Sequence, residues 1–390
     1  MKFLISLTIL TTMIFLPAKG TERIKAGGYV KFVNTAMFGK FDSPWMVENM
    51  IHNRINFSWQ MSDNMSFNAG MRNRFIYGDF VRQFPGYTDL ISEDAGLFKF
   101  LSQTISSANS SILLTTFDRL NLEYSNESFS VTAGRQRINW GQSFAWNPND
   151  IFNAYSFLDF DYEERPGSDA VRIRIFPGFS SVVDFAVKMD RDNRITAAGL
   201  YRFNKWGYDL QFMAGIIGKE DITAGAGWSG SLGKVGFTGE AAYFHPQKNF
   251  RDTTGVVIVS AGLNYMFSNS LMINVEGAYN SYFNNISPES FTDLYYSPLS
   301  VKRITFSKFS WLTQISYPVH PLINASLAAM YLPSLGDGFI AMPSLAYSAG
   351  NNFEISIRAQ LFSGEFQKNE NQGSVSEKIN MVFLRFRYSF

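Results

Sequence analysis

The chain has 390 residues, with 38 Phe, 18 Tyr, 7 Trp and no Cys, and its formal net charge is +1. This charge gives no global argument for a nucleic-acid partner, and the absence of Cys excludes a lipoprotein anchor, a disulfide framework and a thiolate metal site. Many aromatic residues combined with a mean hydropathy of −0.08 are typical of alternating strands. The composition therefore favours one large β architecture over two soluble domains.

The first twenty residues have the pattern of a secretory signal. Lys2 precedes an apolar run, residues 3–17, and the small residues Ala18 and Gly20 occupy the minus-three and minus-one positions. We expect cleavage after about Gly20, giving a signal peptide at 1–20 and a mature domain at 21–390. No later stretch has about 18 uncharged apolar residues, which excludes a helical membrane protein. The possible locations of the exported chain are then the periplasm, the medium and the outer membrane.

From residue 28 onward, apolar and polar residues alternate in segments of about 10 to 13 residues, the period of a strand with two different faces. In the second segment, for example, Ile55 and Phe57 oppose Arg54 and Asn56. About 18 such strands are predicted, enough for a large barrel. They are expected at Gly28–Phe38, Asn49–Met61, Met65–Tyr77, Thr115–Tyr124, Ser128–Asn139, Ala170–Phe176, Ser181–Met189, Ile195–Asn204, Tyr208–Ile217, Ile222–Leu232, Val235–His245, Val256–Phe267, Leu271–Tyr282, Ile304–Tyr317, Ile323–Leu332, Phe339–Ser348, Phe353–Phe362 and Lys378–Phe390.

The connections alternate in length as well. Tight turns follow every even-numbered strand, for instance at Asp63, Asn126 and Gly178, whereas longer stretches such as 78–113 and 140–169 mostly follow odd-numbered strands. This parity is typical of an up-and-down barrel with short periplasmic turns, long outer loops and both termini in the periplasm. The predicted fold class is thus all-β, a transmembrane antiparallel up-and-down β-barrel of about 18 strands.

The polar faces of these strands carry arginines. Each would cost about 2 to 4 kcal/mol on the lipid face at mid-bilayer, so they are expected to face the lumen. The expected pore-lining residues are Arg54, Arg72, Arg74, Arg119, Arg172, Arg174, Arg358, Arg385 and Arg387. Because the last strand closes on the first, they form one arc opposite Glu240 and Glu276, and the resulting field favours anionic or strongly dipolar solutes. Alternatively, the arginines pair with Glu123, Asp184, Glu354 and loop carboxylates and only stiffen the wall.

The last strand alternates Val382, Leu384, Phe386, Tyr388 and Phe390 with arginines on its other face. It resembles the closing strand of bacterial outer-membrane β-barrels. The resemblance implies a location in outer-membrane lipid, and it also implies recognition of the Phe390 strand by the barrel assembly machinery.

The most distinctive stretch, residues 134–169, contains GRQRINWG, WNPND and FLDFDYEERPGSD. GRQ followed by WG resembles a motif in bacterial outer-membrane porin and exporter families, including phosphate-selective and alginate-export barrels. The resemblance implies a long loop that folds into the pore and narrows it. Acidic residues of this loop would then oppose arginines at a constriction, and their acidity argues against phosphate selectivity; they are Asp159, Asp161, Glu163 and Glu164. Alternatively, the tryptophans are interfacial anchors and the acids are solvated.

One detail of this stretch breaks the alternation. Arg135 has the parity of the outward residues Phe129, Val131 and Ala133. A bulge, or the membrane rim, is therefore expected near Gly134.

The sequence offers little for catalysis. Its three histidines, His52, His245 and His320, have no metal-ligand spacing, and the chain has no glycine-rich phosphate loop or dinucleotide fingerprint. An enzyme would need His52 or His245 within hydrogen-bond reach of a serine and an acid. The acidic cluster at 159–164 could bind calcium in a loop, but it lacks an EF-hand pattern. We expect neither enzymatic activity nor a cofactor.

The sequence therefore predicts an outer-membrane, porin-like channel for passive diffusion of small polar, possibly anionic, solutes. Two other classes stay open. One is a gated, substrate-specific transporter of an anionic polymer or a hydrophobic compound, which a dry or plugged lumen would favour. The other is a non-conducting, surface-anchoring barrel with a collapsed lumen and exposed apolar loop residues, such as Phe98, Phe100 and Leu101. No nucleic-acid partner is expected, and the sequence leaves the oligomeric state open.

Overall fold

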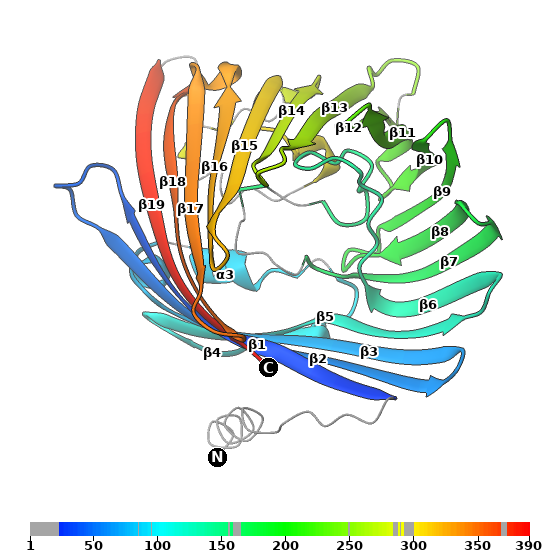
Figure 1. Ribbon diagram of the computed structural model, residues 1–390, viewed down its shortest axis with the longest axis horizontal. Helices are drawn as coiled ribbons and strands as arrows, with labels where there is room; N and C mark the ends of the chain where they lie inside the picture. Colours follow the sequence, from blue (N-terminus) through cyan, green and yellow to red (C-terminus); the bar gives the residue numbers. More distant parts are fainter. Residues whose placement is uncertain are drawn as a thin grey trace.

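The two ends of the chain pair with each other and close a β-sheet. In the computed structural model, β1 (Ile24–Phe38) lies antiparallel to β19 (Ser374–Ser389). Backbone hydrogen bonds of 2.9 and 3.0 Å between Gly28 and Phe390 complete this seam. All neighbouring strands are antiparallel, and the pairing of β1 with β19 closes the sheet into a barrel (Figure 1).

The structure describes residues 23–84, 86–94, 96–154, 157–158, 165–248, 250–283, 288, 290–291, 300–367 and 373–390. Eighteen strands form the barrel wall, as predicted, and β4 is an additional strand. Besides β1 and β19, the strands are β2 (Met46–Ser62), β3 (Met65–Gly78), β4 (Ser102–Ala108), β5 (Ser111–Ser125), β6 (Phe129–Gln136), β7 (Ser168–Gly178), β8 (Ser181–Met189), β9 (Ile195–Lys205), β10 (Tyr208–Ile217), β11 (Asp221–Leu232), β12 (Val235–Pro246), β13 (Val256–Met266), β14 (Met272–Asn280), β15 (Phe309–His320), β16 (Ile323–Leu332), β17 (Gly338–Ser348) and β18 (Phe353–Gln367).

In the part of the chain that the structure describes, the helices are short. They are α2 (Asp79–Gln83), α3 (Tyr87–Ser92) and the 3-10 turns η2 (Lys99–Leu101), η4 (Val301–Arg303) and η5 (Pro333–Leu335). Within the described ranges, no helix is long and apolar enough to cross a membrane.

The predicted alternation of short and long connections is present. Short turns join β2 to β3, β5 to β6 and β7 to β8 at one end of the barrel, which is also the end where β1 begins and β19 finishes. The long connections start and finish at the other end, where β6 and β14 end and β7 and β15 begin.

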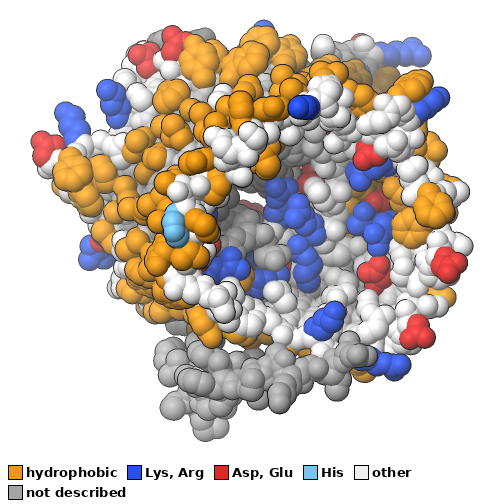
Figure 2. All heavy atoms as spheres, in the orientation of Figure 1, with side chains coloured by type: hydrophobic (Ala, Val, Ile, Leu, Met, Phe, Trp, Pro, Cys, Tyr) orange, Lys and Arg blue, Asp and Glu red, His pale blue; other side chains and the backbone are white. Residues whose placement is uncertain are grey.

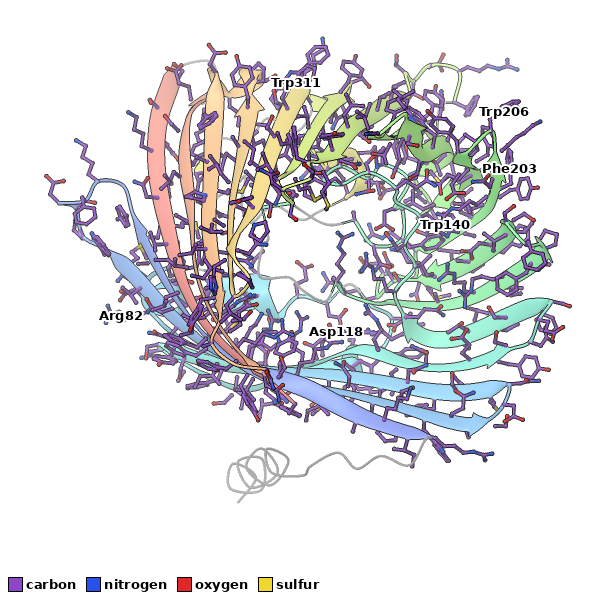
Figure 3. The ribbon with its side chains drawn as sticks, viewed as in Figure 1. Arg82, Asp118, Trp140, Phe203, Trp206 and Trp311 are labelled. Atoms are coloured by element: carbon purple, nitrogen blue, oxygen red, sulfur yellow. The ribbon has the colours of Figure 1, made fainter. Side chains whose placement is uncertain are left out.

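The two faces of the wall differ in polarity. On β7, Val171, Ile173 and Ile175 are 51%, 40% and 42% exposed on the outside, whereas Arg172 and Arg174 line an internal cavity. Figure 3 likewise shows Trp311 on the outer surface. An apolar outer face suits lipid, and the inward arginines avoid the cost of placing charge in the bilayer.

The fold differs from the sequence prediction in the stretch 78–113, which was expected to be a polar connection. It contains α2, α3 and β4, a polar strand that pairs with Ser111–Thr116 on β5. β6 pairs only with the other half of β5, Leu120–Ser125, so this part of β5 keeps a free edge for β4. Because most of β4 is exposed, it has no buried face and no alternating pattern that would have revealed it.

Two predicted strands lose three or more residues at the end next to a long connection. β6 ends at Gln136 rather than Asn139 because the following residues turn into the barrel. β15 begins at Phe309 rather than Ile304: Ile304 and Thr305 are buried after η4, and the Asn280 side-chain amide donates to Thr305 Oγ1 at 3.1 Å.

Candidate functional site

Residues 137–154, called the inner segment below, run inside the barrel (Figure 3, where Trp140 is labelled). Most of their apolar side chains are buried: Ile138, Trp140 and Trp146 are at most 2% exposed, whereas Phe144 is 41% exposed. This segment belongs to the connection that the GRQ and WG resemblance implied would fold into the pore. The lumen is therefore occupied in part by the chain's own residues.

Arg135 fixes the point where the inner segment begins. Its guanidinium group makes two 2.7 Å hydrogen bonds to Asp169 and a third of 2.7 Å to Asp94. Gly134 has φ of +112°, and a Cβ there would lie 2.3 Å from the carbonyl oxygen of Leu120. The distortion that was expected near Gly134 is thus a kink at the glycine. It is not a bulge, because β6 pairs with β5 and β7 without a register shift.

Hydrogen bonds attach the inner segment to the wall. The Trp140 indole donates to Asp184 on β8 at 2.9 Å, and the Gln211 amide on β10 donates to the Trp140 carbonyl at 2.7 Å. Further along, the Asn149 amide donates to the Ala226 carbonyl on β11 at 2.8 Å. The segment thus follows the wall rather than crossing the middle of the barrel.

Two inward glutamates extend this attachment. Glu240 on β12 accepts backbone N–H groups of Gln142, Ser143 and Asn149, and Glu276 on β14 accepts those of residues 144–146. Sequence reasoning placed both glutamates on the wall opposite the arginines but missed their partners. Their spacing from the inner segment, about a hundred residues, left no local signal.

Apolar side chains fill the half of the barrel that carries the inner segment. Trp146 and Phe152 belong to one buried cluster with inward residues such as Leu200, Phe244 and Ile258. Their burial removes apolar surface from water and stabilises the segment in this place.

The opposite half of the lumen is polar and basic. Asp118 on β5 is 1% exposed and accepts hydrogen bonds from Arg54 on β2 (2.7 Å) and Arg72 on β3 (3.0 Å; Figure 3 labels Asp118). Its inward position comes from a bulge: Arg119 lies opposite Gly70 and Phe117 opposite Met71, so Asp118 is the extra residue. An acid beside an inward arginine in a strand was the signal that could have revealed this bulge.

Other predicted lining residues form ion pairs along this wall. Arg172 is paired with Asp184 at 2.5 Å and Arg174 with Glu123 at 2.8 Å. At the seam, Arg385 is paired with Glu354 at 2.5 Å. These are the carboxylates that the wall-stiffening alternative named.

The remaining predicted arginines are all at least partly buried. Arg74 donates to the Ile91 carbonyl at 3.1 Å, and Arg119 donates to the carbonyls of Asp118 and Arg165. Arg387 lies over the Tyr29 ring at 4.5 Å, and Arg358 lies opposite Phe383 in the register with β19. The four predicted constriction acids, Asp159, Asp161, Glu163 and Glu164, lie outside the described residues.

A cavity of about 600 Å³ adjoins the basic wall, and Figure 2 shows a hollow in the middle of the molecule with Lys and Arg side chains along its wall. Six of the lining residues are basic and one, Glu123, is acidic. The basic residues are Lys25, Arg54, Arg119, Arg137, Arg172 and Arg174. Most other lining groups are amides and hydroxyls, such as Asn56, Asn121 and Thr132.

Arg137 differs from the paired arginines. Its Nε has no hydrogen-bond partner within the described part of the chain, and no carboxylate there lies within ion-pair distance. Its positive charge acts on Asp150 of the inner segment. Burial raises the pKa of Asp150 to about 7, against the opposing charges of Arg137 and Arg165.

The histidines do not assemble a catalytic group in the described residues. The ring nitrogens of His52 have no hydrogen-bond partner there, and the ring of His245 contacts the Pro246 carbonyl at 3.0 Å. Over the same ranges, no three acidic or histidine side chains are grouped to hold a metal ion.

A closed antiparallel barrel of eighteen wall strands, apolar outside and charged inside, has the fold of porin-type β-barrels. Solved structures with this fold include the following three. Acinetobacter baumannii OccAB4 matches with a TM-score of 0.58 and 9% identity over 95% of this chain and 99% of that chain. A. baumannii OccAB1 matches with a TM-score of 0.58 and 9% identity over 96% of this chain and 99% of that chain. Pseudomonas aeruginosa OccK3 (OpdO) matches with a TM-score of 0.55 and 9% identity over 94% of this chain and 96% of that chain.

The sequence comparisons add no family. No protein-family model and no curated protein sequence matches the chain. At 9% identity, the structural matches show the fold alone.

Proposed function

We propose that the protein is an outer-membrane channel through which small anionic solutes diffuse passively. The observation that carries the proposal is the lumenal cavity of about 600 Å³, with six basic lining residues and one acidic residue. A water-filled passage with an excess of one charge raises the local concentration of the opposite ion. The solute class is therefore small anions, such as carboxylates.

The inner segment sets the size of the passage in this proposal. An eighteen-stranded barrel is too wide for its wall side chains to fill, and a segment packed on one half leaves the basic half for solutes. The acids at 159–164 would add negative charge to the same connection. We propose them as part of the constriction, as the resemblance to porin and exporter barrels implies.

Not all the proposed lining arginines contribute equally to the field. Arg54 and Arg72 share Asp118, and Arg172 and Arg174 each have a carboxylate partner. A pair of opposite charges has little field a Debye length away, about 8 Å at physiological ionic strength. Arg137 has no carboxylate within ion-pair distance among the described residues, so we propose that it adds its full charge to the field, whereas each ion pair as a unit adds little.

Export and assembly complete the proposal. The signal at 1–20 would direct export and be removed after about Gly20, leaving the barrel at 21–390 for the outer membrane. The aromatic closing strand ending at Phe390 would be the segment that the assembly machinery recognises. The porin-type fold supports this location, and we ascribe no catalysis to the chain.

The gated-transporter alternative has one observation in its favour, because the inner segment occupies part of the lumen. The cavity beside the basic wall favours the diffusion channel instead. For the anchoring alternative, Phe98 and Phe100 are exposed at 41% and 63% as expected, but Leu101 is buried at 3%.

Uptake into proteoliposomes separates these functions. The diffusion channel predicts swelling rates that rise linearly with solute concentration and are faster for a small carboxylate than for a neutral solute of equal size. A swelling rate that saturates at low concentration of one particular solute would favour a substrate-specific transporter. Absence of swelling by correctly folded protein would contradict the channel.

A further inference from the structure

We propose that Glu240 and Glu276 are positioning residues that set the open cross-section of the channel, by holding the inner segment against the wall. This inference rests on the proposed channel function. It assigns to two inward acids a role other than ion selectivity.

Glu276 binds three successive backbone N–H groups. One carboxylate oxygen accepts those of Phe144 and Ala145, both at 2.9 Å, and the other accepts that of Trp146 at 2.8 Å. Successive N–H groups that converge in this way form a concave anion-binding nest. Here the anion is a side chain of the barrel wall, so the nest fixes the segment to β14.

Glu240 repeats the arrangement two strands away. It is 0% exposed and accepts the N–H groups of Gln142, Ser143 (3.0 Å) and Asn149 (2.9 Å). Neither glutamate has a Lys or Arg ion-pair partner among the residues that the structure describes. A buried carboxylate without a cation depends on such hydrogen bonds, and the bonds to it are stronger than neutral ones.

The wall beside these glutamates is shaped to receive the segment. A Cβ at Gly225 would lie 2.2 Å from Asn149 Oδ1, and one at Gly227 would lie 2.9 Å from Gln142 Oε1. Side chains on β11 at these two positions would therefore have to push aside the Asn149 and Gln142 side chains. The glycines and the glutamates form one docking surface on β11, β12 and β14.

The attachments at the ends of the segment decide where it moves when the glutamates release it. Trp140 is held by Asp184 and Gln211, and the Phe152 carbonyl accepts hydrogen bonds from Ser168 and Lys188. With both ends held, residues 142–149 remain inside the barrel. Their only free direction is across the lumen toward the basic wall, which would obstruct the passage.

The test uses single-channel recording of a Glu240→Gln, Glu276→Gln double variant. We expect brief closures at least about ten times as frequent as in the unchanged channel, because hydrogen bonds to a charged acceptor are about twice as strong as neutral ones. Glu123→Gln is the matched control, since Glu123 faces the lumen but pairs with Arg174 and not with the inner segment. It should change ion selectivity without adding closures.

A removable tether makes the cause of the closures testable. Ser143 Oγ and Ser260 Oγ are 3.0 Å apart, and the chain has no cysteine, so Ser143→Cys and Ser260→Cys would form a defined disulfide. In the double-glutamine background, the oxidised tether should abolish the added closures and a reductant should restore them. Folding of each variant is checked by the heat-dependent shift of the barrel on a denaturing gel.

The outcomes separate this inference from the channel proposal. A silent unchanged protein contradicts the channel itself. A conducting unchanged protein whose folded double-glutamine variant shows no added closures overturns the role of the glutamates. Closures that persist with the tether oxidised overturn it as well.

Discussion

The pair formed by Arg174 and Glu123 offers a quantitative test of selectivity by charge. The two side chains are 31% and 27% exposed and both line the cavity. The interaction energy between a unit charge and an ion about 6 Å away in water is about 0.7 kcal/mol, and screening by 0.1 M salt lowers this energy to about 0.4 kcal/mol. A positive charge stabilises an anion by this energy and destabilises a cation by the same amount. Removing or adding one charge therefore changes the anion-to-cation permeability ratio about threefold to fourfold.

Four variants follow from this calculation. Arg174→Gln should lower the ratio by that factor, Glu123→Gln should raise it, and the double variant should leave it unchanged because the net charge is unchanged. Arg137→Gln should lower it as much as Arg174→Gln. The ratio is obtained from the reversal potential of the reconstituted channel in a tenfold KCl gradient.

A double variant that loses as much selectivity as Arg174→Gln would refute this reasoning. Selectivity would then depend on direct contact between the Arg174 guanidinium and the solute, not on the summed field. An Arg137→Gln variant with unchanged selectivity would remove Arg137 from the proposed filter.

Three further predictions concern stability. Asp169→Asn should destabilise the barrel by about 3 to 5 kcal/mol in urea unfolding, because it removes one side of the buried pair with Arg135; a loss below about 1 kcal/mol would contradict the assigned pairing. Gly134→Ala should cost more than Gly233→Ala, whose added Cβ meets nothing within 4 Å, and equal losses would show that the clash with Leu120 is relieved. Because the Asp150 pKa is raised from 3.8 to about 7, the folded state keeps a proton that the unfolded state loses, so stability should fall as pH rises from 4 to 7. Asp150→Asn should flatten this dependence, and an unchanged slope would assign it to another group.

The barrel could be predicted from the sequence because its signal is local. A period of two needs only neighbouring residues, and the short turns at Asp63, Asn126 and Gly178 lie where hairpins need them. The inward direction of the charged face also follows from energetics, because placing Arg172 and Arg174 in contact with lipid would be destabilising.

The arrangement inside the barrel could not be predicted in the same way, because it depends on distant contacts. Asp118 enters the lumen through a bulge that shifts the alternation, and Glu276 meets residues about 130 positions earlier in the chain. Neither contact leaves a periodic pattern. β4 has the opposite difficulty, since a strand exposed on both faces has no pattern to detect.

The most direct test of the channel is the single-channel conductance of purified, refolded protein in a planar bilayer under a salt gradient. The basic lumen predicts a steady open conductance and a reversal potential of the sign for anion preference. A cation preference, or silence from protein shown to be folded, would contradict the proposal.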